Sequence, residues 1–146
     1  MDNDELIRRS EEYLDALFGP GAGCRHTVFL EHLENDALRE TLHRYHVLEA
    51  NTTHLSVDEN YLIGMCVLCA TKSYSTAGMF ARTLLHLGVK KEKLLEAIAR
   101  LSMWIGGIAA AEAAAHVQRA IRDYEQRGQD SLEAWFPAPR REAPHD

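Results

Sequence analysis

Residues 56–69 read SVDENYLIGMCVLC, and this stretch carries the clearest helix start in the chain. Ser56 at the cap and Glu59 three residues later can satisfy each other's backbone donors, which is the pattern of a capping box. The run from Tyr61 to Cys69 is apolar on nearly every side, which is typical of a helix at the centre of a fold. The stretch therefore predicts a central helix that begins at Ser56.

Toward the N-terminus, two further helices are expected. Asn3 or Asp4 can cap a first helix, which ends at Gly19-Pro20-Gly21 because Pro removes a donor and Gly permits a left-handed exit. After a short apolar piece, Val28-Phe29-Leu30, Asn35 can cap a second helix that runs to about Ala50. The expected buried stripe of that helix consists of Leu38, Leu42, Tyr45, Val47 and Leu48.

Toward the C-terminus, three more helices are expected. One starts near Thr76, with Ser75 or Thr76 as its N-cap, and ends at Gly88. The next two are Lys90 to Ile105 and the alanine-rich stretch Ile108–Gln126, separated by Gly106-Gly107. The chain is thus predicted to be all-α with six to seven helices, divided into an N-terminal helix (1–21), a helical domain (22–127) and a partly flexible tail (128–146). The tail's aromatic pair, Trp135 and Phe136, could dock on a neighbour.

Length, charge and cysteine count narrow the function classes. The chain has 146 residues, 46% of them hydrophobic, which is enough for a buried core. Acidic residues outnumber basic ones by 22 to 16, and the net charge of -6 argues against a general nucleic-acid partner. No window approaches the roughly 18 apolar residues of a membrane helix, and the acidic N-terminus is unlike a secretory signal. Three cysteines, an odd number, fit a reducing compartment. We expect a cytoplasmic protein without a membrane partner.

Four stretches have an order and spacing in common with a known family. They are Leu55–Glu59, Leu84–Gly88, Val89–Ala97 and Trp104–Ala110. In this order they resemble the carboxymuconolactone decarboxylase family, which includes the alkylhydroperoxidase D-like proteins. The resemblance covers about Leu55 to Ile121. It implies an all-α fold that assembles into homotrimers, often paired into hexamers, with sites near subunit interfaces.

The resemblance also indicates where an active centre would lie. Redox members use Cys-x-x-Cys-x-x-x-His before the hairpin glycine, and counting back from Gly88 places these positions on Ser73, Thr76 and Phe80. None of the three matches. The same segment is nevertheless rich in hydroxyl groups, so that Ser73, Tyr74 and Thr76, with Lys72, could orient a substrate carboxylate beside Phe80, while capping is the alternative role of these hydroxyls.

Other candidate groups each have a structural alternative. Cys66 and Cys69 form a Cys-x-x-Cys that could exchange disulfides, or they are small hydrophobic residues of the core. Glu59 matches a family glutamate that handles protons, and it also completes the capping box. His54 and His86 are candidate general bases or structural residues.

These observations lead to one functional hypothesis and two alternatives. The chain is expected to bind or act on a small organic acid or lactone by acid/base chemistry, without cofactor or metal. The first alternative is a thiol peroxidase that uses Cys66 and Cys69. The second is a non-catalytic oligomeric scaffold. Whether the protein is an enzyme stays open, with a lyase-like activity favoured.

Overall fold

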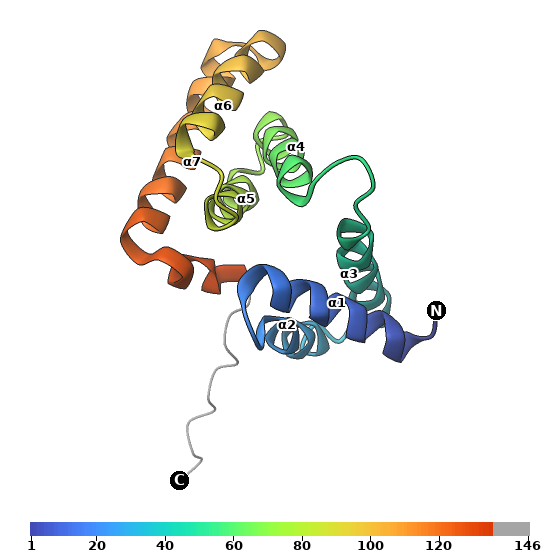
Figure 1. Cartoon of the computed structure of the whole chain (residues 1–146). Coiled ribbons are helices and arrows are strands. Elements are labelled where there is room, and N and C mark those ends of the chain that lie inside the picture. Colours follow the sequence, from blue (N-terminus) through green and yellow to red (C-terminus); the bar gives the residue numbers. More distant parts are fainter. Residues whose placement is uncertain (136–146) are drawn as a thin grey trace. The chain divides into compact units, whose positions relative to one another are not determined.

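The structure, a computed structural model, describes residues 1–135. Within this range it has seven α-helices, one 3-10 helix and no strand, so the predicted all-α class is confirmed (Figure 1). The chain forms two compact units: the first comprises Met1–Asn51 with residues 133–135, and the second is Thr52–Leu132. The elements are α1 (Asn3–Phe18), α2 (Ala22–Glu31), α3 (Asp36–Ala50), α4 (Val57–Ala70), α5 (Tyr74–His86), α6 (Lys91–Ile105), α7 (Gly107–Arg127) and η1 (Gly128–Trp135).

In the first unit, α1 packs against both α2 and α3. Helix α1 is capped by Asp2, whose side chain accepts from the Glu5 amide, so the two predicted caps, Asn3 and Asp4, lie in the first turn instead. The expected exit at Gly19 is confirmed, with φ of 94°. Helix α2 was not predicted, since only its apolar piece was recognised. It lies so close to α1 that a Cβ on Gly23 would come 2.4 Å from the Glu11 Cα, so glycine is required there.

In the second unit, α4 to α7 form two helical hairpins that pack through α5 and α7. The capping box of α4 is confirmed: the Ser56 amide donates to Glu59 Oε2 and the Glu59 amide to Ser56 Oγ, both at 3.2 Å. Positive φ values at Gly88 (92°) and Gly106 (89°) mark the two turns around α6, where the sequence predicted breaks. Helix α5 begins at Tyr74, so neither Ser75 nor Thr76 is its N-cap.

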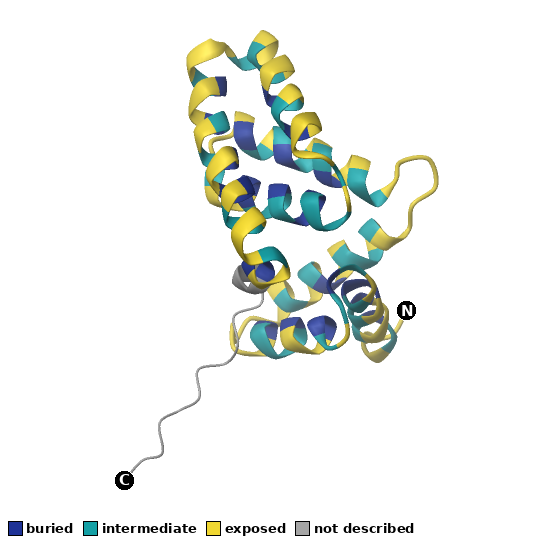
Figure 2. Ribbon diagram, turned by 60° about the vertical axis from the view of Figure 1, so that its left-hand side comes forward, coloured by how far each residue is buried: buried dark blue, intermediate teal, exposed yellow. Residues whose placement is uncertain are grey.

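Burial corrects two sequence expectations. Helix α4 is not buried all round, because its buried residues, Tyr61, Met65 and Cys69, occupy one face and leave Ile63 50% exposed. In α3 the buried residue is His43, whereas Leu38, Tyr45 and Leu48 are exposed by 42%, 56% and 70%. Figure 2 shows buried residues on the facing sides of helices within each unit. The histidine face of α3, rather than its leucine face, therefore packs on α1.

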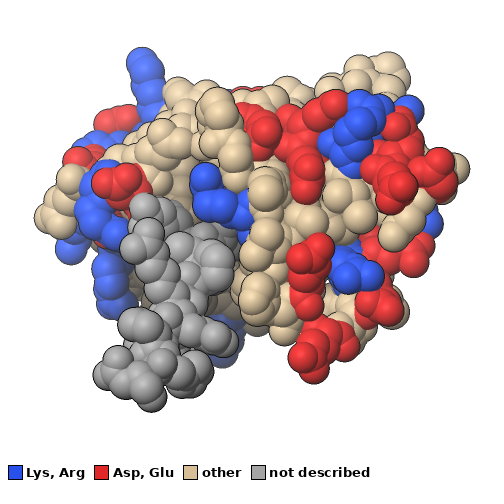
Figure 3. Space-filling model, turned by 90° about the horizontal axis from the view of Figure 1, so that it is seen from below, with Lys and Arg blue, Asp and Glu red and all other residues tan. Residues whose placement is uncertain are grey.

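Ion pairs run along and between the helices. On the face shown in Figure 3, acidic and basic side chains are intermixed, as expected from pairs such as Arg8–Glu5 within α1. Two pairs of the second unit join helices: Arg82 with Asp123 at 3.1 Å and Lys91 with Glu125 at 2.9 Å. The Arg82–Asp123 pair is partly buried, whereas the Lys91–Glu125 pair is exposed, and exposed pairs each stabilise a fold by about 0–1 kcal/mol. The first pair connects α7 with α5 and the second connects α7 with α6.

The expected segments 1–21, 22–127 and 128–146 stay a prediction, and the packing of the chain ends bears on them as follows. Helix α1 does not stand apart, because it packs on α2 and α3. Gly128, with φ of 57°, ends α7 and is followed by η1. Expectations about the Trp135 and Phe136 side chains and about the rest of the tail fall outside the described residues. None of the described helices is both long and apolar enough to cross a membrane.

Candidate functional site

A polar cluster lies where α5 begins beside α7. The Tyr74 hydroxyl donates to Glu112 Oε2 at 3.0 Å. The Tyr74 ring stacks on the His116 ring, with centroids 4.4 Å apart and planes inclined by 8°. Partial burial, together with the Glu112 carboxylate, raises the pKa of Tyr74 above its usual value, so the phenol keeps its proton near neutral pH. A phenol, a carboxylate and an imidazole are thus held in contact, and we call them the Tyr74 cluster.

Several predicted binding residues surround this cluster. Ser73 is the N-cap residue of α5 but makes no side-chain capping bond, and Lys72 before it has a positive φ of 62°. The first amides of α5 therefore keep their capacity to bind an anion, which the helix dipole also favours. Lys72, Ser73 and Thr76 are exposed. This end of α5 can receive a carboxylate beside the Tyr74 cluster.

The two cysteines of α4 lie in a setting that disfavours thiolate. Cys66 is half-buried and Cys69 is buried, and both are free thiols. Burial raises the pKa of Cys66, and burial with the charge of Cys66 raises that of Cys69 to about 11. A reactive thiol needs the opposite shift, toward or below neutral pH. Cys69 behaves as a small residue of the core.

Phe80 fills the position where the resemblance places a histidine. Its ring contacts the Tyr61 ring with centroids 4.9 Å apart. It also lies over Gly64, where an added Cβ would come 2.5 Å from the Phe80 Cε2 atom. Gly64 therefore makes room for Phe80, and the space holds packed aromatic rings in place of a proton carrier.

The predicted proton-transfer residues Glu59, His54 and His86 do not join the Tyr74 cluster. Glu59 is bound within its capping box at the start of α4, whereas Tyr74 follows the end of that helix. Helix α4 has 14 residues, and at 1.5 Å per residue it separates the two groups by about 20 Å. His86 lies in the last turn of α5, opposite the Tyr74 end, and His54 is exposed in the segment before α4. Within the chain, the structure therefore does not bring Glu59 to Ser73 or Tyr74.

Sequence reasoning missed Glu112 and His116 as members of a site. Both lie in the alanine-rich segment, which was expected to serve close packing or a subunit interface. They are four residues apart and therefore on one face of α7. A polar pair at this spacing among alanines was the available signal, but the partner on α5 follows only from the packing of the two helices.

A second cluster of titratable groups lies in the first unit. Ser10 Oγ is 2.9 Å from His43 Nδ1 and 3.1 Å from His46 Nδ1. The His26 ring meets the His46 ring edge-on with centroids 4.6 Å apart. Burial is the main cause that lowers the pKa of His26 to about 3 and that of His46 to about 4. We call these four residues the histidine cluster, which is neutral near pH 7.

The histidine cluster is not a metal centre. Among the described residues, no group of three or more His, Cys, Asp or Glu side chains is arranged to hold a metal ion. Ser10 occupies the space between the two Nδ1 atoms, and His43 Nε2 is buried without a hydrogen-bond partner. The cluster is therefore a buried polar network within the α1–α3 packing.

The chain matches no protein-family model, no curated protein and no solved structure. The resemblance to the carboxymuconolactone decarboxylase family therefore stays a prediction, carried by the four stretches quoted above. A fold class does not define an activity, so a function must be argued from the Tyr74 cluster itself.

Proposed function

We propose that the protein binds a small organic acid or lactone and acts on it by acid/base chemistry at the Tyr74 cluster, without a cofactor. The observation that carries this proposal is the 3.0 Å hydrogen bond from the Tyr74 hydroxyl to Glu112, beside the stacked His116 ring. Such a pair holds a proton between a donor and a base in a fixed geometry, as acid/base work requires. The site corresponds to the segment that the family resemblance indicated.

Each group has a defined role in this proposal. Glu112 accepts the hydrogen bond of the Tyr74 hydroxyl and fixes the orientation of Tyr74, whose oxygen keeps lone pairs that can accept a hydrogen bond from the ligand. His116 is the second proton carrier. The ligand carboxylate or carbonyl lies at the α5 N-terminus, where backbone amides and the Lys72 ammonium favour negative charge.

Two alternatives remain, with different support. A thiol peroxidase using Cys66 and Cys69 would need thiolates, and burial raises the pKa of both groups. A non-catalytic scaffold is favoured by the packing of Phe80 over Tyr61 and Gly64. Peroxide consumption with a dithiol reductant would identify the first alternative if Cys66→Ser or Cys69→Ser abolished it.

We also propose that the chain self-associates as a homotrimer or hexamer in the cytoplasm. At the α6–α7 turn, Met103, Trp104 and Ile108 are exposed by 73%, 81% and 83%. Monomeric proteins seldom expose large apolar side chains together, and such patches mark interaction surfaces. Sedimentation equilibrium tests the assembly: a trimeric or hexameric mass supports it, and a monomeric mass over the micromolar range contradicts it.

The acid/base proposal is tested with substitutions that keep the shape of the site. Dicarboxylic acids and γ-lactones are the probes, with binding measured by saturation-transfer NMR and turnover by the loss of lactone. We expect Tyr74→Phe and Glu112→Gln to lower kcat/KM by about a hundredfold, as for loss of a positioned acid or base. If the protein binds the probes without turning them over, each of these substitutions should raise Kd by about tenfold, because one hydrogen bond to a charged ligand is lost.

Tyr124→Phe supplies the matched control. Tyr124 lies on α7 and is half-buried, and the same hydroxyl is removed there outside the Tyr74 cluster. It should leave binding and turnover unchanged. Equal effects of Tyr74→Phe and Tyr124→Phe, or probes that neither bind nor react, would overturn the proposal and leave the scaffold.

A further inference from the structure

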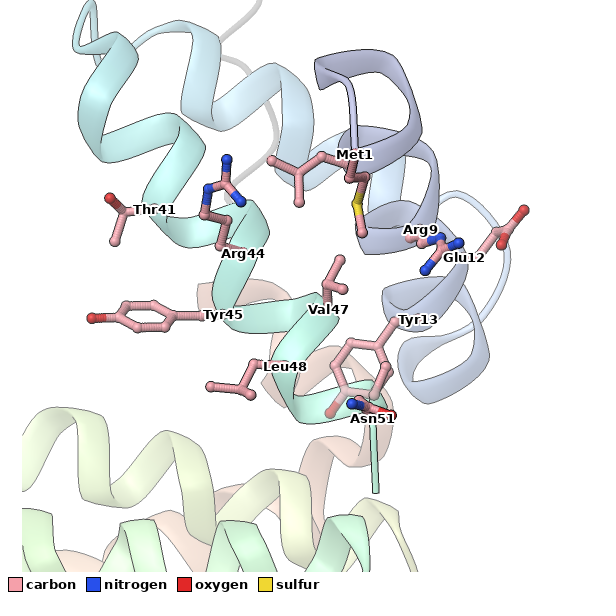
Figure 4. A pocket seen from close by; sticks show the side chains of 12 residues that line it. Met1, Arg9, Glu12, Tyr13, Thr41, Arg44, Tyr45, Val47, Leu48 and Asn51 are labelled. Atoms are coloured by element: carbon pink, nitrogen blue, oxygen red, sulfur yellow. The ribbon is translucent and has the colours of Figure 1, made fainter. Parts of the chain in front are cut away.

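A groove lies between α1 and α3 within the first unit (Figure 4). Its volume is about 960 Å³, and all of its lining residues belong to the range 1–51. Ligand pockets usually measure about 300–1,000 Å³ and have mostly apolar walls with a few polar groups. The groove is large enough for an extended small molecule.

The groove has an apolar base and apolar side chains at its opening. Leu6 and Tyr13 of α1 are buried, at 3% and 9% exposed, and form part of its lining. On α3, Tyr45 and Leu48 are exposed although they lie on a helix that buries its other face. Figure 4 shows Tyr45 and Leu48 extending to one side of α3 and Val47 to the other. An apolar ligand body would remove these exposed surfaces from water.

The charged groups of the groove leave guanidinium donors available. Arg44 on α3 uses its Nε and Nη2 atoms on Glu40 Oε1, at 3.0 and 2.6 Å, and Nη1 has no partner among the described residues. Arg9 on α1 uses only Nε, on Glu5. The carboxylate that lines the groove, Glu12, is paired with Arg8.

We propose that this groove binds an amphipathic monocarboxylate, with its apolar chain along Leu6, Tyr13 and Leu48 and its carboxylate at Arg44. A guanidinium presents paired N–H donors that match a carboxylate, and the exposed pair with Glu40 can be exchanged at little loss. The charge complementarity therefore favours an acid over a neutral or cationic amphiphile. This site is in the first unit and is independent of the function proposed for the Tyr74 cluster.

Calorimetry with the full chain tests this inference with head groups of opposite charge. Dodecanoate should bind with one site per chain, whereas dodecyltrimethylammonium, with the same chain length, should bind at least about tenfold more weakly. Arg44→Gln should weaken dodecanoate binding by about tenfold, because one charge-assisted contact is lost. Arg44 is more than half exposed, so the variant should fold, which circular dichroism checks.

Arg100→Gln is the matched control. Arg100 pairs with Glu96 four residues earlier, as Arg44 does with Glu40, but it lies on α6 in the second unit. The Arg100→Gln variant should bind dodecanoate with unchanged affinity. In the unsubstituted chain, addition of dodecanoate should change the amide chemical shifts of residues in α1 and α3. Equal affinity for both head groups, equal loss in both variants, or no binding would overturn the proposal. An oligomer that Leu48→Asp dissociates would also overturn it and show that a second copy fills the groove.

Discussion

Between its helices the first unit buries Ser10, His26 and His43, whereas the second unit fills most of the same kind of space with Met65, Leu84 and a series of alanines and buries only two hydroxyl groups, those of Thr83 and Ser131. Both interiors are closed by helix packing, but in the first unit the buried polar side chains meet one another across three helices, whereas Thr83 and Ser131 of the second unit bond to backbone carbonyls three or four residues earlier. A buried polar group without a partner costs about 1–3 kcal/mol, so the first unit depends on its network being complete. The second unit depends on shape.

One hydroxyl group connects the network of the first unit. Ser10 Oγ lies within hydrogen-bond distance of both His43 Nδ1 and His46 Nδ1. A hydroxyl has one proton to donate, so two neutral rings are best served when one Nδ1 carries hydrogen and the other does not. The two rings then hold opposite tautomers. Protonation of both rings would remove the acceptor that Ser10 needs.

The largest expected difference between the units is their response to acid. The pKa of His26 is lowered from 6.5 to about 3 and that of His46 to about 4. Below pH 6.5 the unfolded chain binds protons that the folded unit does not, so stability falls as the pH falls from 6.5 toward 3. Each of these two histidines contributes a loss that approaches about 1.4 kcal/mol per pH unit, for His26 down to about pH 3 and for His46 down to about pH 4. Hydrogen exchange, corrected for intrinsic rates, should show α1–α3 losing protection between pH 6.5 and 4.

The second unit supplies the contrast within the same experiment. Its hydrogen bonds from Arg127 and Arg82 lower the pKa of Asp123 from 3.8 to about 2, so that stabilisation is lost only as the pH falls below about 4. Helices α5 and α7 should therefore stay protected from hydrogen exchange at pH 4.5.

The substitution His26→Phe should make the protection of α1–α3 less dependent on pH. His32 is an exposed histidine of the same unit, so His32→Gln should leave the pH dependence unchanged. Parallel loss of protection in both units would contradict the comparison.

The two units also differ in how much of their structure could be predicted from the sequence. In the second unit, the capping box at Ser56 and the turns at Gly88 and Gly106 are local signals, because one or two residues settle each backbone conformation. In the first unit, the hydrophobic pattern of α3 indicated the wrong buried face. His43 and His46 pack inward because Ser10, thirty-three and thirty-six residues away, satisfies them. The hydrophobic pattern of α3 alone does not indicate a hydrogen-bond partner that is so distant in the sequence.

The candidate site was predictable only in part for a similar reason. Tyr74 follows from its place in the chain, but Glu112 is thirty-eight residues further on. Their contact depends on the packing of α5 on α7, which no local pattern specifies. Glu59 was placed correctly at a helix start, yet the hairpin of α4 and α5 puts it at the opposite end from Tyr74.

A smaller effect is expected on the free energy of unfolding when a buried apolar side chain of the second unit is shortened. Leu84 is fully buried on α5 of the second unit. Leu84→Ala should lower the free energy of unfolding by about 2–5 kcal/mol, because a cavity remains where packing cannot collapse. Urea denaturation followed by circular dichroism measures the change.

Leu48→Ala is the corresponding change in the first unit, and it should have the smallest effect. Leu48 is 70% exposed, and surface substitutions usually stay within about 0.5 kcal/mol. The two leucines lie on helices of similar length, so the comparison isolates burial. A loss above about 1 kcal/mol for Leu48→Ala would mean that another surface covers this face of α3 in solution. In that case the exposed leucines of α3 would form a packed interface, and the groove beside them would be closed to an amphipathic acid.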